Sequence, residues 1–335
     1  MEKNAETKKK RVMTARWRDR IFVSLLLLWP VLQFCVFYIG VNFNSLLISF
    51  QNITYVNVDS AGNAVNSATS FTWTLLQYQK AFEWFGSSEF GNMLWVSVKS
   101  YLISTCISVP LGLLFAYYIF RKLPGWSAFR VLLFLPMILS GVVMAAIFRY
   151  FIEDCLPSLI ENVWYGGILH HTAPEEATMS LFNPLRKTSY ATLMFFNIWI
   201  GFGTSVLMYS NKMSGISDEV IEAANIDGAT GIRTFWYIVL PYAYPTLSVF
   251  LITGFAQICS NQYNVYNMFS SSLTDNSLRN LGYYLFVEVN TKFRSGGGMP
   301  ELPYYAAIGV ILTLVTVPLT LLLKYVLEKF GPSED

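Results

Sequence analysis

An all-α integral membrane protein with six transmembrane helices is the fold class that the sequence predicts, and three observations predict it. Hydrophobic residues make up 54% of the 335 residues and charged residues only 13%, whereas soluble domains carry about 25% charged residues. The mean hydropathy is +0.43. Six segments have the roughly 20 apolar residues that a helix needs to cross a hydrocarbon core. We expect helices there because lipid cannot satisfy backbone polar groups.

The six predicted spans are bracketed mainly by charged residues. Arg20 precedes the first, Arg121 follows the second, Arg130 and Arg149 flank the third, and Lys324 follows the last. The spans are predicted at residues 21–40, 100–120, 131–148, 188–209, 245–268 and 302–323. The first follows a basic tail and is too long for a signal-peptide core, so we interpret it as an uncleaved helix.

Lysine and arginine residues predict which side of the membrane each loop faces. Six spans place both termini on one side, and basic residues concentrate in cytoplasmic segments. With cytoplasmic termini, fifteen of the 23 basic residues lie inside: Lys3, Lys8, Lys9, Lys10, Arg11, Arg16, Arg18, Arg20, Arg121, Lys122, Arg130, Lys212, Arg233, Lys324 and Lys329. The distribution therefore favours a multi-pass protein with both termini in the cytoplasm.

This topology divides the chain into four parts. We expect a basic cytoplasmic tail at 1–20, the first span with a long external loop at 21–92, a five-helix core at 93–325 that contains a cytoplasmic loop at 211–244, and a cytoplasmic tail at 326–335. Further external loops are expected at 150–187 and 269–301. The external loops either offer a docking surface for a partner or only connect spans. In the first of them, three aromatic residues either anchor the chain at the membrane interface or form a small packed cap: Trp73, Trp84 and Phe85.

Composition argues against several other classes of protein. A net charge of +2 is too small to indicate nucleic-acid binding. The four cysteines lack metal-ligand spacing and are interpreted as small buried hydrophobic residues. His170 and His171 with Glu175 and Glu176 are interpreted as a solvated external loop, because their spacing is not that of a rigid metal site. We expect no catalytic residue and no metal site.

The cytoplasmic loop has an internal design that predicts two short helices. Ser217 is the expected N-cap of the first, and Asp218 and Glu219 lie in its first turn. Val220, Ile221 and Ala224 are expected to share one face. Gly228 is expected to end the first helix. Thr230 is expected to cap a second helix, which Pro241 is expected to end.

An apolar helix face in a cytoplasmic loop needs a cover, either lipid or a groove on a partner protein. The first helix is acidic, with Asp218, Glu219, Glu222 and Asp227 and no basic residue before Arg233. Because the inner leaflet is anionic, it repels such a helix. The charge therefore favours a protein groove over lipid.

The loop carries a spaced motif that resembles a known family. The motif reads Glu222-Ala223-Ala224, three residues, Gly228, nine residues, and Ile238-Val239-Leu240-Pro241. This resembles the EAA motif of permeases in binding-protein-dependent ABC importers. The segments 197–203 and 226–229 resemble the carbohydrate-uptake branch, with its maltose-type and glycerol-phosphate-type permeases. The resemblance covers the second to sixth spans.

The resemblance implies an ABC importer permease fold and a coupling element that lies in a cleft of a separate ATPase. It implies coupling roles for Glu222, Ala223, Ala224, Asp227, Gly228, Ile238, Leu240 and Pro241. The implied partners are a second homologous permease subunit, a cytoplasmic ATPase dimer, an extracellular solute-binding protein, a sugar and membrane lipid. No nucleic acid is implied. The implied location is the bacterial inner membrane. The chain has no phosphate-binding G-x-x-x-x-G-K-[ST] loop, so we expect no cofactor here and ATP on the partner.

The predicted fifth span contains a polar run, residues 257–267, that is too rich in amides and hydroxyls to face lipid. Amides, hydroxyls and aromatic rings suit a sugar, and no charged residue lies deep in any predicted span. These groups either line the substrate path or only join helices. In maltose-type permeases, matching positions contact substrate: Gly201, Ser260, Asn261 and Asn264, with Tyr263 at an aromatic position. Thr204 replaces a bulkier aromatic residue, and residues 273–276 depart from the usual Gly-Gly-Pro.

Three functions remain as alternatives to a sugar permease. A permease of the same class for a non-sugar solute has the same motif. A secondary carrier would require embedded ionisable residues or paired broken helices, and a membrane enzyme would require a polar cluster at membrane depth. The sequence names neither the sugar nor its chain length.

Overall fold

The computed structural model describes residues 2–55, 69–169, 174, 179–182, 188–229, 231–270, 273, 276–294 and 301–332. It divides into two compact units, Met1–Ala81 with Met299–Val310 and Phe82–Gly298 with Ile311–Asp335. The solvated-loop residues His170, His171, Glu175 and Glu176, and the expected cap Thr230, lie outside the described residues. Helices dominate both units, so the predicted all-α membrane fold is confirmed.

The first unit begins with a long apolar helix and adds a hairpin that the sequence did not predict. Helices α1 (Glu2–Gln33), η1 (Phe34–Gly40) and α2 (Val41–Ser49) are continuous, and Asp19–Ser49 is long and apolar enough to span a membrane. Strands β1 (Gln51–Tyr55) and β2 (Thr69–Trp73) then pair antiparallel, with Gln51 opposite Trp73. Helix α3 (Leu76–Phe85) follows, and the hydroxyls of Ser49 and Tyr78 hydrogen-bond at 2.7 Å. The expected long external loop therefore contains regular structure.

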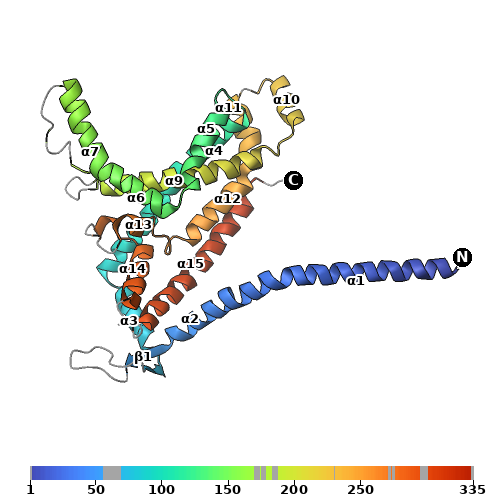
Figure 1. Ribbon diagram of the computed structural model, residues 1–335, viewed down its shortest axis with the longest axis horizontal. Coiled ribbons are helices and arrows are strands. Elements are labelled where there is room, and N and C mark those ends of the chain that lie inside the picture. The colour runs from blue at the N-terminus through green and yellow to red at the C-terminus, as the bar shows by residue number, and fades with distance from the viewer. Residues whose placement is uncertain are drawn as a thin grey trace. The chain divides into compact units, whose positions relative to one another are not determined.

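The second unit is a helical bundle in which α4, α9 and α12 pack against one another (Figure 1). Ser87 caps α4, accepting a hydrogen bond from the Phe90 backbone N–H at 3.2 Å. The helices are α4 (Ser88–Phe120), α5 (Trp126–Ile138), α6 (Gly141–Tyr150), η2 (Phe151–Cys155), α7 (Leu156–Leu159), η3 (Ile160–Leu169), α9 (Ser189–Met213), α10 (Asp218–Ile226), α11 (Gly231–Thr234), η5 (Phe235–Val239), α12 (Leu240–Ala256), α13 (Val265–Phe269), η6 (Asn276–Leu278) and α14 (Leu281–Arg294). Helix α15 (Leu302–Phe330) runs from the first unit into the second.

Five helices among the described residues are long and apolar enough to span a membrane, or six if one bent pair counts as a span. The third span, predicted at 131–148, falls on this bent pair. Trp126–Ile138 and Gly141–Tyr165 meet at 100° (Figure 1). The break has a local cause, because Ser140 starts a new helix and its hydroxyl accepts a hydrogen bond from the Val143 backbone N–H.

The fifth span also differs from its predicted bounds, 245–268. It begins earlier, at Gly231, and ends at Ala256, so the polar run from 257 lies in a non-helical segment followed by α13. Pro241 does not end a helix as expected, because it lies in the first turn of α12. The π-helical segment η5 immediately precedes it, and wider turns of this kind accommodate a residue without a backbone donor.

Two buried clusters hold the second unit together. One joins α6, α9, α13 and α14 around Phe148, Phe196 and Met268. The other joins the far halves of α4 and α9 to η5 and α12 around Tyr209, Met213 and Val239. Core residues on neighbouring helices are closely packed. The first cluster therefore fixes the turn at Tyr263, and the second fixes the loop between α9 and α12.

Aromatic residues near the start of α4 form a third, smaller cluster. Trp84 stacks on Tyr284 with ring centroids 5.1 Å apart, and Phe85 meets Phe90 edge-on at 4.7 Å. Trp84 and Phe85 are thus packed together, which agrees with the expected cap. Trp73 is exposed and contacts Phe71 on its own strand.

Candidate functional site

The loop between α9 and α12 ends its first helix with a Schellman motif. Ser217 precedes α10 as expected, although its side chain caps no backbone N–H. The Gly228 N–H donates to the Asn225 carbonyl at 3.1 Å, and the Ala229 N–H donates to the Ala224 carbonyl at 2.9 Å. Gly228 has φ +77°, the left-handed conformation that this motif requires and that glycine adopts without strain. The predicted break at Gly228 is confirmed.

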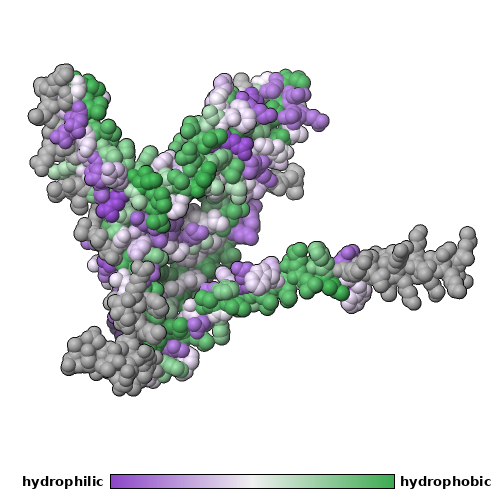
Figure 2. Space-filling model, in the orientation of Figure 1, coloured by the Kyte–Doolittle hydropathy of each residue, from purple (hydrophilic) through white to green (hydrophobic). Residues whose placement is uncertain are grey.

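Helix α10 presents acidic and small residues to solvent. Glu222, Ala223 and Asp227 are exposed, and Ile226 is 86% exposed although it is apolar. Figure 2 shows a hydrophilic surface over α10, in contrast to the hydrophobic surface over α5. The exposed surface of α10 is therefore acidic, with one apolar side chain, Ile226, within it.

The opposite side of the loop packs onto the bundle. Ala224 is buried and Ile221 packs against the Tyr209–Val239 cluster. The Tyr117 hydroxyl donates to the Gly231 carbonyl at 2.8 Å, which ties the second short helix to α4. Val220 does not share this face with Ile221 and Ala224 as predicted, because it is 45% exposed. The apolar face that was expected to need lipid or a partner groove is instead covered by the bundle itself. The loop is therefore held firmly while one surface stays uncovered.

The remaining motif residues lie at the base of the loop. Ile238 and Leu240 are half-buried against the same cluster, and Pro241 lies in α12. Sequence reasoning missed the exposed residues beyond Gly228, namely Ile232, Trp236 and Tyr237, of which Tyr237 is 81% exposed. Their spacing of four and five residues on a helix was a usable signal for a second exposed face.

The polar run after α12 forms a left-handed turn stabilised by side-chain amides. Tyr263 and Asn264 have φ of 48° and 57°. The Asn197 amide on α9 donates to the Tyr263 carbonyl at 2.7 Å, and the Asn264 amide donates to the Asn197 side-chain oxygen at 2.8 Å. Asn261 accepts a hydrogen bond from the Tyr263 N–H at 2.8 Å. The side-chain amide of Asn264 is thus hydrogen-bonded within the protein.

Gly282 allows this turn to lie directly on α14. A Cβ there would come within 2.6 Å of the Asn261 carbonyl carbon and oxygen and of the Ser260 carbonyl oxygen. These are backbone atoms, which cannot move aside cheaply. Nearby, the Tyr283 hydroxyl donates to the Ser270 carbonyl at 2.8 Å, and burial raises the pKa of Tyr283.

The six residues predicted for the substrate path do not all meet. Asn261 and Tyr263 line one cavity between α4, α9 and α12, while Ser260 is exposed. Gly201 is exposed on α9, and the Thr204 hydroxyl contacts the sulfur of Met137 on α5 at 3.1 Å. The structure thus brings two of the six together at this cavity.

This cavity has a volume of about 160 Å³, and none of its lining residues is charged. Sequence reasoning missed its hydroxyl-bearing wall on α4. Ser104, Thr105 and Ser108 line it, and Ser205 lines it from α9. The spacing of Ser97, Ser100, Ser104 and Ser108 by three or four residues places these hydroxyls on one helical face, which was a signal in the sequence.

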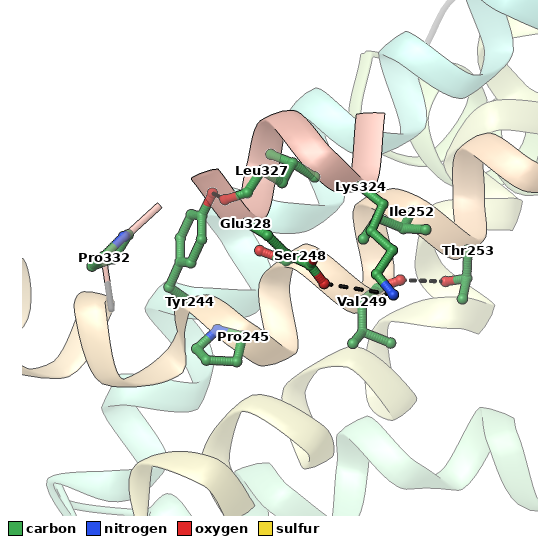
Figure 3. Close-up of a pocket in the computed structure, with 10 residues that line it drawn as sticks. All are labelled: Tyr244, Pro245, Ser248, Val249, Ile252, Thr253, Lys324, Leu327, Glu328 and Pro332. Carbon is green, nitrogen blue, oxygen red and sulfur yellow. Dashed lines mark hydrogen bonds and ion pairs between the residues drawn. The ribbon is translucent and has the colours of Figure 1, made fainter. Parts of the chain in front are cut away.

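A larger cavity, of about 490 Å³, lies between the ends of α12 and α15 (Figure 3). The Tyr244 hydroxyl donates to the Leu327 carbonyl at 2.9 Å, and Lys324 pairs with Glu328 at 3.6 Å. Most of its walls are apolar, including Pro245 and Val249. The Tyr244 contact joins the first turns of α12 to the last turns of α15.

Charged residues of the second unit pair near loops. Arg149 donates to Glu153 at 2.8 Å and to the Met268 carbonyl at 2.6 Å, which attaches the bent helix α6 to α13. Arg279 pairs with Glu89 at 3.2 Å. Within the described residues, no group of three or more His, Cys, Asp or Glu side chains could hold a metal ion.

Comparison with known proteins identifies relatives of this chain. Residues 108–332 match the family described as "Binding-protein-dependent transport system inner membrane component". The arabinooligosaccharides transport system permease protein AraP of Bacillus subtilis (strain 168) is 26% identical over 325 residues, which cover 91% of this chain and 90% of the relative. The alpha-glucoside transport system permease protein AglF of Rhizobium meliloti (strain 1021) is 29% identical over 70% of this chain and 65% of its own length.

A solved structure shares the fold. It is a bacterial alginate ABC transporter in complex with an alginate pentasaccharide-bound periplasmic protein, and one of its chains superposes with a TM-score of 0.63. The match covers 92% of this chain and 95% of that chain at 17% identity. At this identity the likeness concerns the fold.

Proposed function

The chain belongs to the binding-protein-dependent transport system inner membrane components, and from this premise we propose that it forms half of the membrane path of an ATP-driven importer for a carbohydrate. In this proposal, the chain itself carries no nucleotide site. A separate cytoplasmic ATPase dimer binds and hydrolyses ATP. A second homologous permease subunit supplies the other half of the path, and an extracellular binding protein delivers the sugar.

The observation that carries the proposal is the uncovered face of α10. It is acidic, contains exposed Ile226, and ends in a defined turn at Gly228. Because Ile221 and Ala224 pack onto the bundle, a force applied to α10 reaches α4, α9 and α12 without first deforming a flexible loop. A bundle with two stable arrangements shifts toward the arrangement in which the contact at α10 is more favourable.

We infer that Glu222, Ala223, Asp227 and Gly228 contact the ATPase. Glu222 would pair with a basic residue of the ATPase, and Ala223 would permit close approach. The contact is supported from within the loop by Ala224, and from the base of the loop by Ile238, Leu240 and Pro241. This placement requires α10 and both termini to be cytoplasmic, in a bacterial cytoplasmic membrane. The positive-inside distribution of lysine and arginine supports it.

The carbohydrate substrate is supported by the uncharged cavity and by the relatives. Hydroxyl and amide groups of Ser205, Asn261 and their neighbours line the cavity, and such groups exchange hydrogen bonds with sugar hydroxyls. The relatives named above transport arabinooligosaccharides and alpha-glucosides. We propose that Ser260, Asn261, Tyr263 and Asn264, with Gly201 and Thr204 on α9, belong to the path, where Asn264 also stabilises the turn.

The experiment that tests this function is sugar uptake by the reconstituted complex with an Asn261→Leu variant. Leucine keeps a similar volume but also removes the acceptor of the Tyr263 N–H bond, so assembly of the complex is checked by co-purification. In the assembled complex, sugar-stimulated ATP hydrolysis and uptake should fall together. The matched control is Asn42→Leu, whose side chain is exposed on α2 and belongs neither to the proposed path nor to α10. Wild-type uptake by Asn261→Leu would remove this residue from the path.

A further inference from the structure

We propose that the hydroxyls of Ser104 and Ser108 on α4 form a second binding wall of the path and select a neutral sugar ring over an acidic one. The proposal rests on the proposed function and extends it to a helix that neither the motif nor the relatives assign to substrate. It concerns the cavity between α4, α9, α12 and the turn at 257–264.

The first argument is that these two hydroxyls lack partners. Serine and threonine side chains in helices usually bond to a backbone carbonyl of the preceding turn, as Ser205 on α9 and Thr253 on α12 do at 3.4 and 2.7 Å. Among the hydrogen bonds of the described residues, none involves the hydroxyl of Ser104 or Ser108, although both line the cavity. Each therefore offers a free donor and acceptor to whatever occupies it.

The second argument is depth. Ser104 and Ser108 lie near the middle of α4, which spans Ser88–Phe120 and is apolar enough to cross a membrane. A polar group without a partner is unfavourable at that depth in the membrane. Water or a hydroxylated ligand removes this penalty, whereas a lipid chain does not.

The third argument is the geometry of the two walls. Ser104 and Ser108 are one helical turn apart on α4, and Asn261 and Ser205 line the same cavity from other elements. A volume of about 160 Å³ equals roughly five water molecules at about 30 Å³ each. This is the scale of one sugar ring with hydroxyls directed toward both walls.

The fourth argument selects the class of sugar. No lysine, arginine, aspartate or glutamate lines the cavity. A carboxylate brought to this depth without a cation would lose its hydration without compensation, whereas the hydroxyls of a neutral ring can be satisfied by serine and asparagine side chains. The cavity is therefore suited to neutral rings and unsuited to uronic acids.

Thiol labelling tests the position of the α4 wall. In a variant that lacks the four native cysteines, single cysteines are introduced by Ser104→Cys and Ser108→Cys. Leu113→Cys is the control, because Leu113 lies on the same helix and is buried. The detergent-purified complex is treated with a small hydrophilic thiol reagent. We expect labelling at 104 and 108 to be at least about tenfold faster than at 113, because a core thiol reacts only after local opening.

An Asn261→Cys variant separates failure of this inference from failure of the proposed function. Labelling at 261 with none at 104 and 108 would overturn the α4 wall while retaining the path. Absence of labelling at all three positions would overturn the wall and also count against the path.

Protection by sugars tests the ligand class. A mixture of neutral maltose and arabinose oligosaccharides should slow labelling of Ser108→Cys severalfold, and an equal concentration of oligogalacturonate should not. Equal protection by both, or by neither, would overturn the selection of neutral rings.

Discussion

Replacement of Gly228 by alanine is expected to weaken coupling without disrupting the bundle. Gly228 has φ +77°, and a Cβ at this position would meet no atom within 4 Å. The cost is therefore conformational and not steric. The left-handed conformation costs an L-residue about 1–2 kcal/mol, and alanine recovers about 0.4–1 kcal/mol by restricting the unfolded chain.

The net penalty is about 1 kcal/mol, which lowers the ratio of native to non-native turn about fivefold. We expect sugar uptake by the reconstituted complex to fall by up to about fivefold, and the ATP hydrolysed per sugar transported to rise. Gly228→Asn should be less impaired, because asparagine adopts this conformation more readily than alanine.

Gly91→Ala is the matched control. Gly91 is helical and exposed, and a Cβ added there would also meet no atom within 4 Å, so alanine should be neutral or stabilising by up to about 1 kcal/mol. Wild-type uptake and coupling by Gly228→Ala would refute the reasoning. Equal losses in Gly228→Ala and Gly228→Asn would also refute it, since the order of the two variants follows from backbone conformation.

Three further substitutions test separate contacts. Glu222→Lys should abolish uptake and sugar-stimulated ATP hydrolysis while membrane insertion, checked by quantitative immunoblot, stays normal; retained transport would exclude a charge contact. Asn197→Leu removes two hydrogen bonds to the turn and should lower the stability of the complex by about 1–3 kcal/mol for each buried group left unpaired, seen as a lower thermal midpoint. Gly282→Ala should destabilise by about 1–3 kcal/mol through overpacking, and an unchanged midpoint would show that the turn can move away from α14.

The sequence predicted those features that depend on composition and local chemistry. The apolar segments followed from hydropathy, and the break at Gly228 followed from the one residue type that adopts a left-handed turn without strain. The acidic surface of α10 was also predictable, because Asp218, Glu219 and Glu222 lie within two helical turns. Each of these properties is local to a few residues.

The features that sequence reasoning missed depend on contacts between distant segments. The turn at Tyr263 is stabilised by Asn197, 66 residues away, so a polar run inside an apolar stretch was assigned to a span. The bend at Ser140 was missed because the apolar pattern continues through it, although Ser140 and Gly141 were start signals for a helix. The wall of Ser104 and Ser108 was missed because serine is common in membrane helices for packing.

The central claim is that α10 lies in the cytoplasm, where a separate ATPase binds it. The most direct measurement is labelling of Ala223→Cys, in the cysteine-free variant, with a membrane-impermeant thiol reagent on intact and on permeabilised cells. Ala223 is exposed in this chain, and the variant is expressed without the ATPase subunit that would cover it, so the thiol can react wherever the reagent reaches it. The account predicts labelling only after permeabilisation, and labelling on intact cells would contradict it.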